Sequence, residues 1–575
     1  MSGSEPVVRF PDSFNLADYW LYDRVRDGRG DHVAVRMGDR TWTYAEVAEK
    51  SQALARSLQE YGVAPGDRVY IVLPDVPPFA WGIFATLTAG AVVTMGNPVA
   101  PAADLARVVE YVGARVVITT PAVADAMLPE LARSTTRLVK ILLAPDAGID
   151  DDPEATVEAG PALADTRRSW VSLDHAVRSG IPSARARPVT HRDDWAIWLF
   201  TSGSTGRPKA AMHCHRDFAF NTEVYAKASM GYRADDVTVS VPRLFFGYAT
   251  GTNLWFPFAV GATVCLFPER PTPESLAAAI RRYRPTIVTN VPTMLAKLLD
   301  HDDELRARGE SGIDLSCVRF HLSAGEALPP ALLERFLARF GGAVYDGIGS
   351  AEMFHIYCTN RPGDVVPGSL GRAVPGYELA VLPEEATGAG AAPVPVGEIG
   401  VLWVRGDSVA QGYYQDREKS WRTFHGHWCR TGDLFRIDER GYLWFSGRAD
   451  DLLKVGGVFV APLEVEECLC THDAVSGAAV IGAQEQGLTK PKAIVVVRPE
   501  ARARVADAAG RAALAAELQQ HVRGRLSKHK YPRWVVFIDE LPRNDRGKVD
   551  KKTLAAREAA GELGQVDGAG DGAGA

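Results

Sequence analysis

Short apolar segments alternate with helical patterns along this chain, and this alternation constrains the fold more than any other feature. Segments of the strand type occupy residues 68–73, 114–119 and 286–291, and helical patterns occupy residues 44–61 and 273–284. Such alternation is typical of βαβ units, which build largely parallel sheets and place ligand sites at the carboxyl ends of strands. We therefore predict an α/β protein.

Bulk composition is that of an ordinary globular protein. The chain has 575 residues, of which 46% are hydrophobic and 23% charged, so we expect more than one domain. A net charge of −7 argues against a nucleic-acid partner. The longest apolar stretch, residues 79–93, is interrupted by Gly82 and Gly90 and predicts a buried helix and a strand, not a membrane span. Seven cysteines without paired spacing and a polar N-terminus predict a reduced, cytoplasmic protein.

A run rich in glycine and hydroxyl side chains, residues 201–209, follows an apolar strand pattern at residues 195–200. Glycines let backbone N–H groups approach an anion, hydroxyls add donors and lysine adds charge, so the run suits nucleotide phosphates. A surface linker of this composition would seldom follow a strand. The run is not a Walker loop, because Lys209 follows Gly206 by three positions and precedes Ala210. A P-loop kinase or ATPase is therefore disfavoured.

The run resembles the phosphate loop of the acyl-adenylate-forming (ANL) superfamily, which contains acyl-CoA synthetases, luciferases and the adenylation domains of peptide synthetases. The resemblance implies an enzyme that consumes ATP and a catalytic role for Lys209. Ala210 stands where the family usually has glycine, and the added methyl group is expected to shift the loop slightly. The residues that the resemblance assigns to ATP in this run are Thr201, Ser202, Gly203, Ser204, Thr205, Gly206 and Lys209.

A second motif begins at Asp346, passes through a glycine-rich turn and ends at Glu352. A carboxylate after such a turn can hold Mg²⁺ that bridges nucleotide phosphates. By the same resemblance, Glu352 is the metal ligand and a catalytic residue, while Asp346 and Gly347 bind ATP at its adenine. Ala351 replaces the threonine that is most common in the family, so one phosphate contact is expected to be lost or partly replaced by Ser350.

Three further residues match family motifs farther along the chain. Asp433 ends a tight Thr-Gly-Asp turn, and its carboxylate would accept hydrogen bonds from both ribose hydroxyls of ATP. Arg448 would contact phosphate or ribose. Lys548 lies in a basic C-terminal loop, where its ammonium would neutralise the substrate carboxylate and the developing charge on the α-phosphate. The resemblance therefore makes Lys548 the main catalytic residue of adenylation.

The motifs also imply two domains that move relative to each other. Asp450 matches the family's hinge, and Gly456 and Gly457 match a loop that lets a pantetheine arm pass close to the backbone. We predict a large multi-subdomain N-terminal domain with parallel-rich sheets and a small mobile α+β C-terminal domain that carries Lys548. The expected parts are an N-terminal adenylation domain over residues 1–449, a C-terminal domain over residues 450–560 and a disordered tail over residues 561–575.

The segment 243–251 indicates the kind of acid that is activated. Its Phe-Phe-Gly-Tyr sequence offers flat aromatic walls, and Gly247 leaves space for a planar ring. This segment is similar to benzoate-CoA ligases, as are residues 223–227, 269–273, 323–329, 346–356 and 487–493. By this resemblance, the candidate residues of the acid pocket are Phe246, Gly247, Tyr248, Ala324, Gly347, Gly349 and His355.

Together the motifs predict an AMP-forming acid–thiol ligase that uses ATP, Mg²⁺ and coenzyme A. A benzoate or substituted benzoate would form an aryl-adenylate and pyrophosphate, and CoA would then take the aryl group and release AMP. Three alternatives stay open: an enzyme that loads a carrier protein, an aliphatic acyl-CoA ligase, which the aromatic segment disfavours, and a catalytically idle nucleotide-binding protein. A monomer and a homodimer are both compatible with the sequence.

Overall fold

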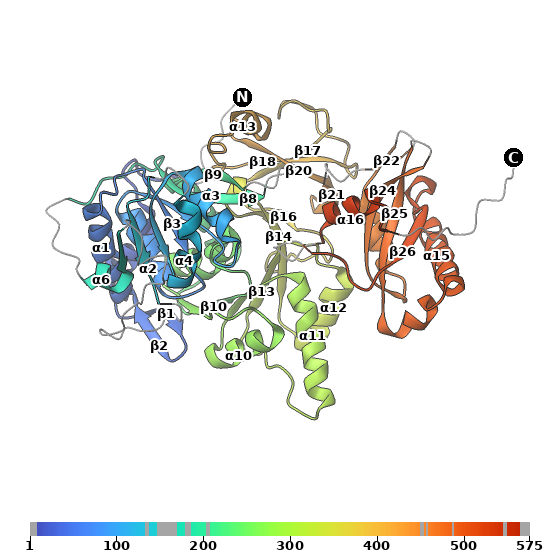
Figure 1. The fold of residues 1–575 in the computed structure, drawn as a ribbon, viewed down its shortest axis with the longest axis horizontal. Coiled ribbons are helices and arrows are strands. Elements are labelled where there is room, and N and C mark those ends of the chain that lie inside the picture. Colours follow the sequence, from blue (N-terminus) through green and yellow to red (C-terminus); the bar gives the residue numbers. More distant parts are fainter. Residues whose placement is uncertain are drawn as a thin grey trace. The chain divides into compact units, whose positions relative to one another are not determined.

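The chain divides into two compact units, coloured along the sequence in Figure 1. Unit 1 comprises Met1–Ala380 and Trp403–Arg430, and unit 2 comprises Val381–Leu402 and Thr431–Ala575. The predicted boundary at residue 450 stays a prediction. The computed structural model describes residues 8–132, 137–145, 169–178, 186–202, 208–448, 453–455, 458–485, 488–543 and 549–563.

The first sheet of unit 1 has the strand order β7-β6-β5-β3-β4-β8-β9. Adjacent strands pair in parallel except β8 and β9, which pair antiparallel. Helices α3 and α4 bury apolar side chains such as Val109 and Met127 against it. The strands are β3 (Arg68–Val72), β4 (Val92–Met95), β5 (Ala114–Thr119), β6 (Lys140–Leu143), β7 (Ser169–Ser172), β8 (Trp195–Ser202) and β9 (Pro208–Cys214). The accompanying helices are α1 (Tyr44–Glu60), α2 (Pro78–Thr88), α3 (Ala102–Val112), α4 (Pro121–Leu131) and α6 (Leu173–Arg178).

The second sheet of unit 1 has the order β16-β15-β14-β13-β12-β10-β11-β1-β2. It is parallel from β14 to β1 and antiparallel at both edges. Helices α10, α11 and α12, green in Figure 1, pack Leu276, Leu298 and Phe336 into its core. The strands are β1 (Val33–Met37), β2 (Arg40–Thr43), β10 (Val237–Ser240), β11 (Thr263–Leu266), β12 (Ile287–Asn290), β13 (Phe320–Ala324), β14 (Val344–Gly349), β15 (Ile356–Thr359) and β16 (Arg372–Ala373). The helices are α7 (His215–Asn221), α8 (Gly247–Thr250), α9 (Phe256–Val260), α10 (Pro273–Tyr283), α11 (Pro292–Ala307) and α12 (Pro330–Phe340).

Short helical turns and a further sheet complete the region before residue 449. The sheet has the order β17-β18-β20-β19, with β21 paired to β20. The turns are η1 (Asp18–Tyr22), η2 (Val25–Arg29), η3 (Thr222–Lys227), η4 (Gly251–Trp255) and η5 (Ala351–Met353). The remaining elements are β17 (Glu378–Leu382), β18 (Gly400–Arg405), α13 (Arg417–Thr423), β19 (Phe424–His425), β20 (Trp428–Ile437) and β21 (Leu443–Arg448).

The C-terminal part of unit 2 is built on the sheet β24-β25-β26 and the strand pair β22-β23. Val480 packs with α14 and α15, whereas its neighbours Ala479 and Ile481 pack with α16. Because successive strand residues face opposite sides, helices cover both faces of this small sheet. The elements are β22 (Leu453–Val455), β23 (Val458–Val460), α14 (Pro462–Cys470), β24 (Val475–Glu485), β25 (Leu488–Val497), η7 (Pro499–Val505), α15 (Ala508–Arg523), η8 (Lys528–Lys530), β26 (Trp534–Phe537) and α16 (Lys551–Ala559).

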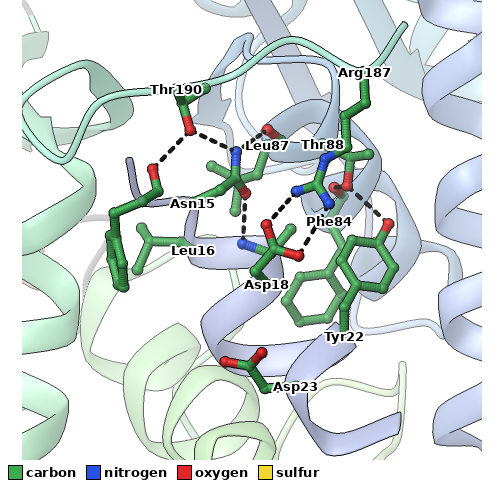
Figure 2. A network of polar contacts seen from close by, with 12 residues as sticks. Asn15, Leu16, Asp18, Tyr22, Asp23, Phe84, Leu87, Thr88, Arg187 and Thr190 are labelled. Carbon is green, nitrogen blue, oxygen red and sulfur yellow. Dashed lines mark hydrogen bonds and ion pairs between the residues drawn. The ribbon is translucent and has the colours of Figure 1, made fainter. Parts of the chain in front are cut away.

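A polar network ties the N-terminal segment to the first sheet's helices (Figure 2). The Asn15 side-chain amide donates to the Leu87 carbonyl at 2.8 Å and to the Thr190 hydroxyl at 3.1 Å. Arg187 forms a two-pronged ion pair with Asp18, with N–O distances of 3.0 and 2.7 Å. The Tyr22 hydroxyl lies 2.8 Å from the Thr88 hydroxyl, and this contact joins η1 to α2.

The elements expected from the sequence lie where the patterns place them. Strands β3, β5 and β12 and helices α1 and α10 occupy the five predicted segments, and residues 79–93 form α2 and then β4. Thr43 and Glu46 form a capping box that starts α1, and Thr272 caps α10. In the described part of the chain, no helix combines the length and the apolar character needed to cross a membrane.

Candidate active site

The hairpin β8–β9 places the two ends of the glycine-rich run side by side. Thr201 pairs with Lys209 and Ser202 pairs with Pro208, on either side of residues 203–207. Of the predicted ATP-binding residues, Gly203, Ser204, Thr205 and Gly206 lie outside the described residues. The described stem therefore fixes where the run starts and ends, and Lys209 is the second residue of β9.

Residues 410–414 pair with the free edge of β9. The Met212 N–H donates to the Gly412 carbonyl and the Tyr414 N–H donates to the Ala210 carbonyl, both at 2.9 Å. Tyr413 and Ala211 form an isolated antiparallel bridge between these contacts. This pairing brings a segment from 200 residues later in the chain beside the phosphate hairpin.

Tyr413 connects the hairpin to the predicted metal ligand. Its hydroxyl donates to Oε1 of Glu352 at 2.7 Å, and the ammonium of Lys209 lies 5.7 Å from the centre of its ring. The Ala410 N–H also donates to the Glu352 carbonyl at 2.8 Å. The structure therefore brings together Lys209 and Glu352, as predicted, and adds Tyr413, which the sequence analysis missed. The sequence offers only the adjacent Gly412 and Tyr413 as a signal for it.

The charges at this position suit a metal–phosphate group. Partial burial and the neighbouring Lys419 lower the pKa of Lys209, while Asp416 and Glu352 act in the opposite direction. Glu352 offers a half-buried carboxylate, the ligand type that Mg²⁺ prefers, and Lys209 offers a cation for phosphate oxygens. The donor set present here therefore fits Mg²⁺ bound together with a nucleotide's phosphates.

Asp346 lies in the middle of β14 with its carboxyl group buried. Burial raises the pKa of Asp346 to about 8, although the Ser323 hydroxyl and the Gly347 N–H oppose this increase. Among the described residues, Oδ1 of Asp346 has no hydrogen-bond partner. A buried polar atom without a partner is costly, so the position suits a ligand that supplies hydrogen bonds, such as the adenine predicted here.

Gly347 and Gly349 have a packing reason to be glycine. A Cβ atom at Gly347 would lie 2.8 Å from the Cys358 carbonyl oxygen, and one at Gly349 would lie 2.5 Å from the His355 carbonyl oxygen. Both glycines therefore permit the close pairing of β14 with β15. Their predicted place in the acid pocket stays a prediction, as does that of Ala324, which ends β13 opposite Gly347.

A tight turn at Phe354 sets the direction of His355. Phe354 has φ +69° and ψ −59°, and the His355 N–H donates to the Met353 carbonyl at 2.9 Å. The backbone of any residue other than glycine is strained in this conformation, at a cost of about 1–3 kcal/mol. The Phe354 ring lies 4.3 Å from Phe218 and 5.4 Å from Trp255, measured between ring centres, and this packing holds the strained turn.

His355 is buried in a cluster of aromatic rings. Its ring centre lies 4.8 Å from Phe256, 5.4 Å from Tyr225 and 5.5 Å from Tyr248. A Cβ atom at Gly251 would lie 2.5 Å from the imidazole, so this glycine makes room for it. We call these five residues the aromatic cluster. Sequence analysis predicted Tyr248 and His355, but it missed Tyr225, Gly251 and Phe256, which only the fold brings together.

His355 and Tyr248 both present polar atoms within the aromatic cluster. His355 Nε2 lies 3.0 Å from the Tyr248 carbonyl, which can only accept, so Nε2 carries the proton. Burial lowers the pKa of His355 to about 3, so the ring is neutral and Nδ1 is an acceptor. Within the described residues, neither Nδ1 nor the Tyr248 hydroxyl has a partner. The cluster thus combines flat apolar walls with two unused polar atoms, as a ligand pocket does.

The segment that carries Phe246, Gly247 and Tyr248 is anchored at its start. Asp75 accepts a hydrogen bond from the Leu244 N–H at 2.9 Å and lies 3.5 Å from Arg243. Burial raises the pKa of Asp75 to about 6 against the effect of Arg243. Phe246 then precedes α8, and a Cβ atom at Gly247 would lie 3.2 Å from Leu199, so alanine would require only a small adjustment there.

In unit 2, the predicted ribose and phosphate residues lie opposite each other. Asp433 on β20 pairs in register with Arg448 on β21. The Thr431 hydroxyl accepts from the Asp433 N–H at 3.2 Å and donates to the Leu402 carbonyl at 2.9 Å. The predicted tight turn is instead part of β20, in which Gly432 has φ +77°. The ligand contacts predicted for Asp433 and Arg448 stay predictions.

Two hairpin stems frame the remaining predicted residues. Strands β22 and β23 pair Val455 with Val458, on either side of Gly456 and Gly457. A bridge between Arg543 and Val549 encloses the five residues that end with Lys548. Four predicted residues of this part, Asp450, Gly456, Gly457 and Lys548, lie outside the described residues.

Two family profiles match the chain, one in its N-terminal part and one in its C-terminal part. The profile of the AMP-binding enzyme family matches residues 22–414, and that of the AMP-binding enzyme C-terminal domain matches residues 464–548. The chain is 37% identical to benzoate–CoA ligase from Thauera aromatica, over 96% of this chain and 98% of that protein. It is 34% identical to 4-hydroxybenzoate–CoA/benzoate–CoA ligase from Rhodopseudomonas palustris, over 94% of each chain.

Solved structures agree with the profiles. The anthranilate CoA ligase AuaEII in complex with anthranoyl-AMP matches with a TM-score of 0.82 and 31% identity, covering 96% of this chain and 99% of that one. A benzoate CoA ligase from Burkholderia xenovorans LB400 matches with a TM-score of 0.79 and 34% identity, covering 94% and 99%. The predicted α/β fold and adenylate-forming class are confirmed, and the chain belongs to the AMP-binding enzyme family.

Proposed function

We propose that this enzyme activates benzoate or a substituted benzoate with ATP and transfers the aryl group to coenzyme A, releasing pyrophosphate and AMP. The observation that carries the proposal is the segment 346–355, which joins three features. Asp346 begins it with a buried carboxyl group, Glu352 lies beside Lys209 and Tyr413, and His355 ends it inside the aromatic cluster. One short segment thus spans positions for adenine, for metal and phosphate, and for an aromatic ring.

The chain's own residues account for the first half-reaction. Lys209 and the glycine-rich run bind the phosphates, and the aromatic cluster orients the acid so that its carboxylate oxygen attacks the α-phosphorus as pyrophosphate leaves. Glu352 would hold Mg²⁺, which supplies positive charge to the leaving phosphates. Asp433 and Arg448 bind the ribose side, and Lys548 neutralises charge on the carboxylate and the α-phosphate. Positioning and electrostatics suffice, and no protein nucleophile is required.

The second half-reaction transfers the aryl group to a thiol. The C-terminal part turns about Asp450, so that Lys548 leaves and the loop of Gly456 and Gly457 admits the pantetheine arm. The CoA thiolate attacks the carbonyl carbon of the mixed anhydride, the bond to the phosphate oxygen breaks and AMP leaves. A carrier protein's phosphopantetheine would react by the same chemistry, so the acceptor is decided by measurement.

The experiment is pyrophosphate release with MgATP across a panel of acids, each with and without CoA. The panel contains benzoate, its hydroxy, amino and chloro derivatives, cinnamate, acetate and octanoate. We expect turnover with benzoates that rises strongly with CoA. A preference for octanoate would contradict the aromatic pocket, and release that CoA does not accelerate would identify a carrier-protein acceptor. Absence of release with every acid would favour the idle nucleotide-binding protein.

A variant of the aromatic cluster sharpens this experiment. His355→Ala removes the ring that lies against Phe256 and Tyr225. We expect it to change the ranking of the substituted benzoates by about tenfold or more, while the KM for ATP stays within about twofold, because a contact to the acid affects the two substrates differently. His321→Ala is the matched control, since His321 is also buried but lies on β13 against Phe336. Equal effects of both variants on every acid would contradict the assignment of His355 to the acid pocket.

A further inference from the structure

A buried histidine–aspartate pair lies behind the segment that carries Glu352. His213 is on β9, and Asp217, in the first turn of α7, is four residues later. Both side chains are buried, and Nδ1 of His213 lies 3.0 Å from Oδ2 of Asp217. On the other side of the ring, Nε2 lies 2.6 Å from the carbonyl oxygen of Ala351. The pair thus reaches the residue directly before Glu352.

The hydrogen bonds define where the protons are. A carbonyl oxygen only accepts, so Nε2 of His213 must carry a hydrogen that it donates to Ala351. Oδ2 of Asp217 accepts from the Cys214 N–H at 3.0 Å as well as facing Nδ1. Burial raises the pKa of Asp217, and His213 opposes this increase. The carboxyl group and the imidazole therefore work as one unit that keeps an N–H directed at the Ala351 carbonyl.

The segment at Glu352 is consequently held from two directions. His213 binds the carbonyl before it, and residues 410–413 bind its own carbonyl and its carboxylate. Ala351 stands where the family usually has threonine, so its side chain has no hydroxyl group. The polar contact of this residue is therefore made by its backbone carbonyl, which binds His213.

We propose that His213 and Asp217 are positioning residues for the metal–phosphate site: they fix the Ala351 carbonyl so that the Glu352 carboxylate faces the bound MgATP. This inference rests on the proposed role of Glu352. It assigns to the pair no contact with substrate. Its loss should therefore weaken the use of MgATP without changing which acid is preferred.

The test is Asp217→Asn, measured as ATP–pyrophosphate exchange with benzoate. The Cys214 N–H orients the new amide so that its oxygen takes the place of Oδ2. An imidazole with a single N–H then faces two acceptors, this oxygen and the Ala351 carbonyl, so its hydrogen bond to Ala351 is weakened. We expect the KM for MgATP to rise about tenfold while the ranking of the acids stays unchanged. A KM for MgATP that stays within about twofold of the wild-type value in Asp217→Asn would overturn the proposal.

Two further variants separate positioning from folding. His215→Asn alters another buried imidazole, which accepts a hydrogen bond from the Leu16 N–H, and it should lower the melting temperature without raising the KM for MgATP. His213→Gln keeps a donor for Ala351 and should recover part of the affinity that His213→Leu loses. Equal KM values for these two His213 variants would contradict the inference. Failure of the proposed function would be a different result, since wild-type enzyme would then show no exchange with benzoates.

Discussion

Asp346 and Glu352 carry the same functional group six positions apart, in different surroundings. Asp346 is 6% exposed and its carboxyl group is kept neutral near pH 7 by burial, whereas Glu352 is half-buried and accepts a hydrogen bond from Tyr413. A neutral acid can both donate to and accept from a purine, and an ionised carboxylate can bind a cation. Surroundings rather than residue type therefore assign the two roles.

The burial of Asp346 predicts a pH dependence of stability. Because the folded state raises its pKa to about 8, the native protein holds a proton that the unfolded chain releases above about pH 4. Stability should therefore fall by up to ~1.4 kcal/mol per pH unit as the pH rises from about 4 to about 8. In Asp346→Asn this contribution is absent. The melting temperature of the variant, relative to that of the wild type, should therefore increase as the pH rises. Parallel melting curves from pH 5 to 8 would contradict the assignment.

Tyr413 predicts a specific effect on the metal–phosphate site. Tyr413→Phe removes the hydroxyl that donates to Glu352 but keeps the ring beside Lys209. A hydrogen bond to a charged group contributes about 1.5–3 kcal/mol, so the Mg²⁺ concentration for half-maximal exchange should rise about tenfold. Tyr414→Phe is the control, because the hydroxyl that it removes accepts a hydrogen bond from the Gln415 side-chain amide at 3.3 Å. An equal rise of the half-maximal Mg²⁺ concentration in both variants would contradict the assignment of Tyr413 to the metal–phosphate site.

Elements with a clear hydrophobic period were predictable, and the contacts between distant elements were not. The strands and helices expected around residues 68–73 and 273–284 are confirmed, because apolar spacing and caps are local signals. The strained turn at Phe354 left no local signal, since packing against Phe218 supports it. The pairing of residues 410–414 with β9 also depends on tertiary structure. Sequence motifs therefore found Lys209 and Glu352 but not the tyrosine between them.

Helix α16 predicts how the C-terminal part depends on one buried ion pair. Lys492 on β25 has a side chain that is 1% exposed, and it pairs with Glu558 on α16 at 2.5 Å. Glu558→Gln would leave a buried ammonium without its counter-charge, which we expect to cost about 3 kcal/mol in urea unfolding. Arg557→Ala, at an exposed position of the same helix, should change stability by less than about 0.5 kcal/mol. Equal free energies of unfolding for the two variants would contradict a stabilising role of the Lys492–Glu558 pair.

At the size of the whole molecule, the two profiles and the structural matches cover nearly all of the chain. The sequence motifs therefore predicted the family. Residues such as Asp450 and Lys548 rest on the resemblance, because their positions lie outside the described residues. Their roles are testable as a separation of the two half-reactions.

Asp450→Pro should separate adenylation from thioester formation. Proline fixes φ near −65° and would prevent the backbone rotation that a hinge requires. We expect ATP–pyrophosphate exchange within about threefold of wild type and a loss of aryl-CoA formation of at least about a hundredfold. Asp450→Gly, which keeps rotation free, is the control and should retain both activities. Equal loss of the two half-reactions in Asp450→Pro would contradict the hinge.

Identification of the products gives the most direct test of the reaction itself. The enzyme is incubated with MgATP and benzoate, with and without CoA. The products are then separated by chromatography and identified and quantified by mass spectrometry. We predict benzoyl-CoA, AMP and pyrophosphate in equal amounts when CoA is present, and enzyme-bound benzoyl-AMP when it is absent. Formation of ADP and phosphate, or accumulation of the adenylate without thioester in the presence of CoA, would contradict the proposed reaction.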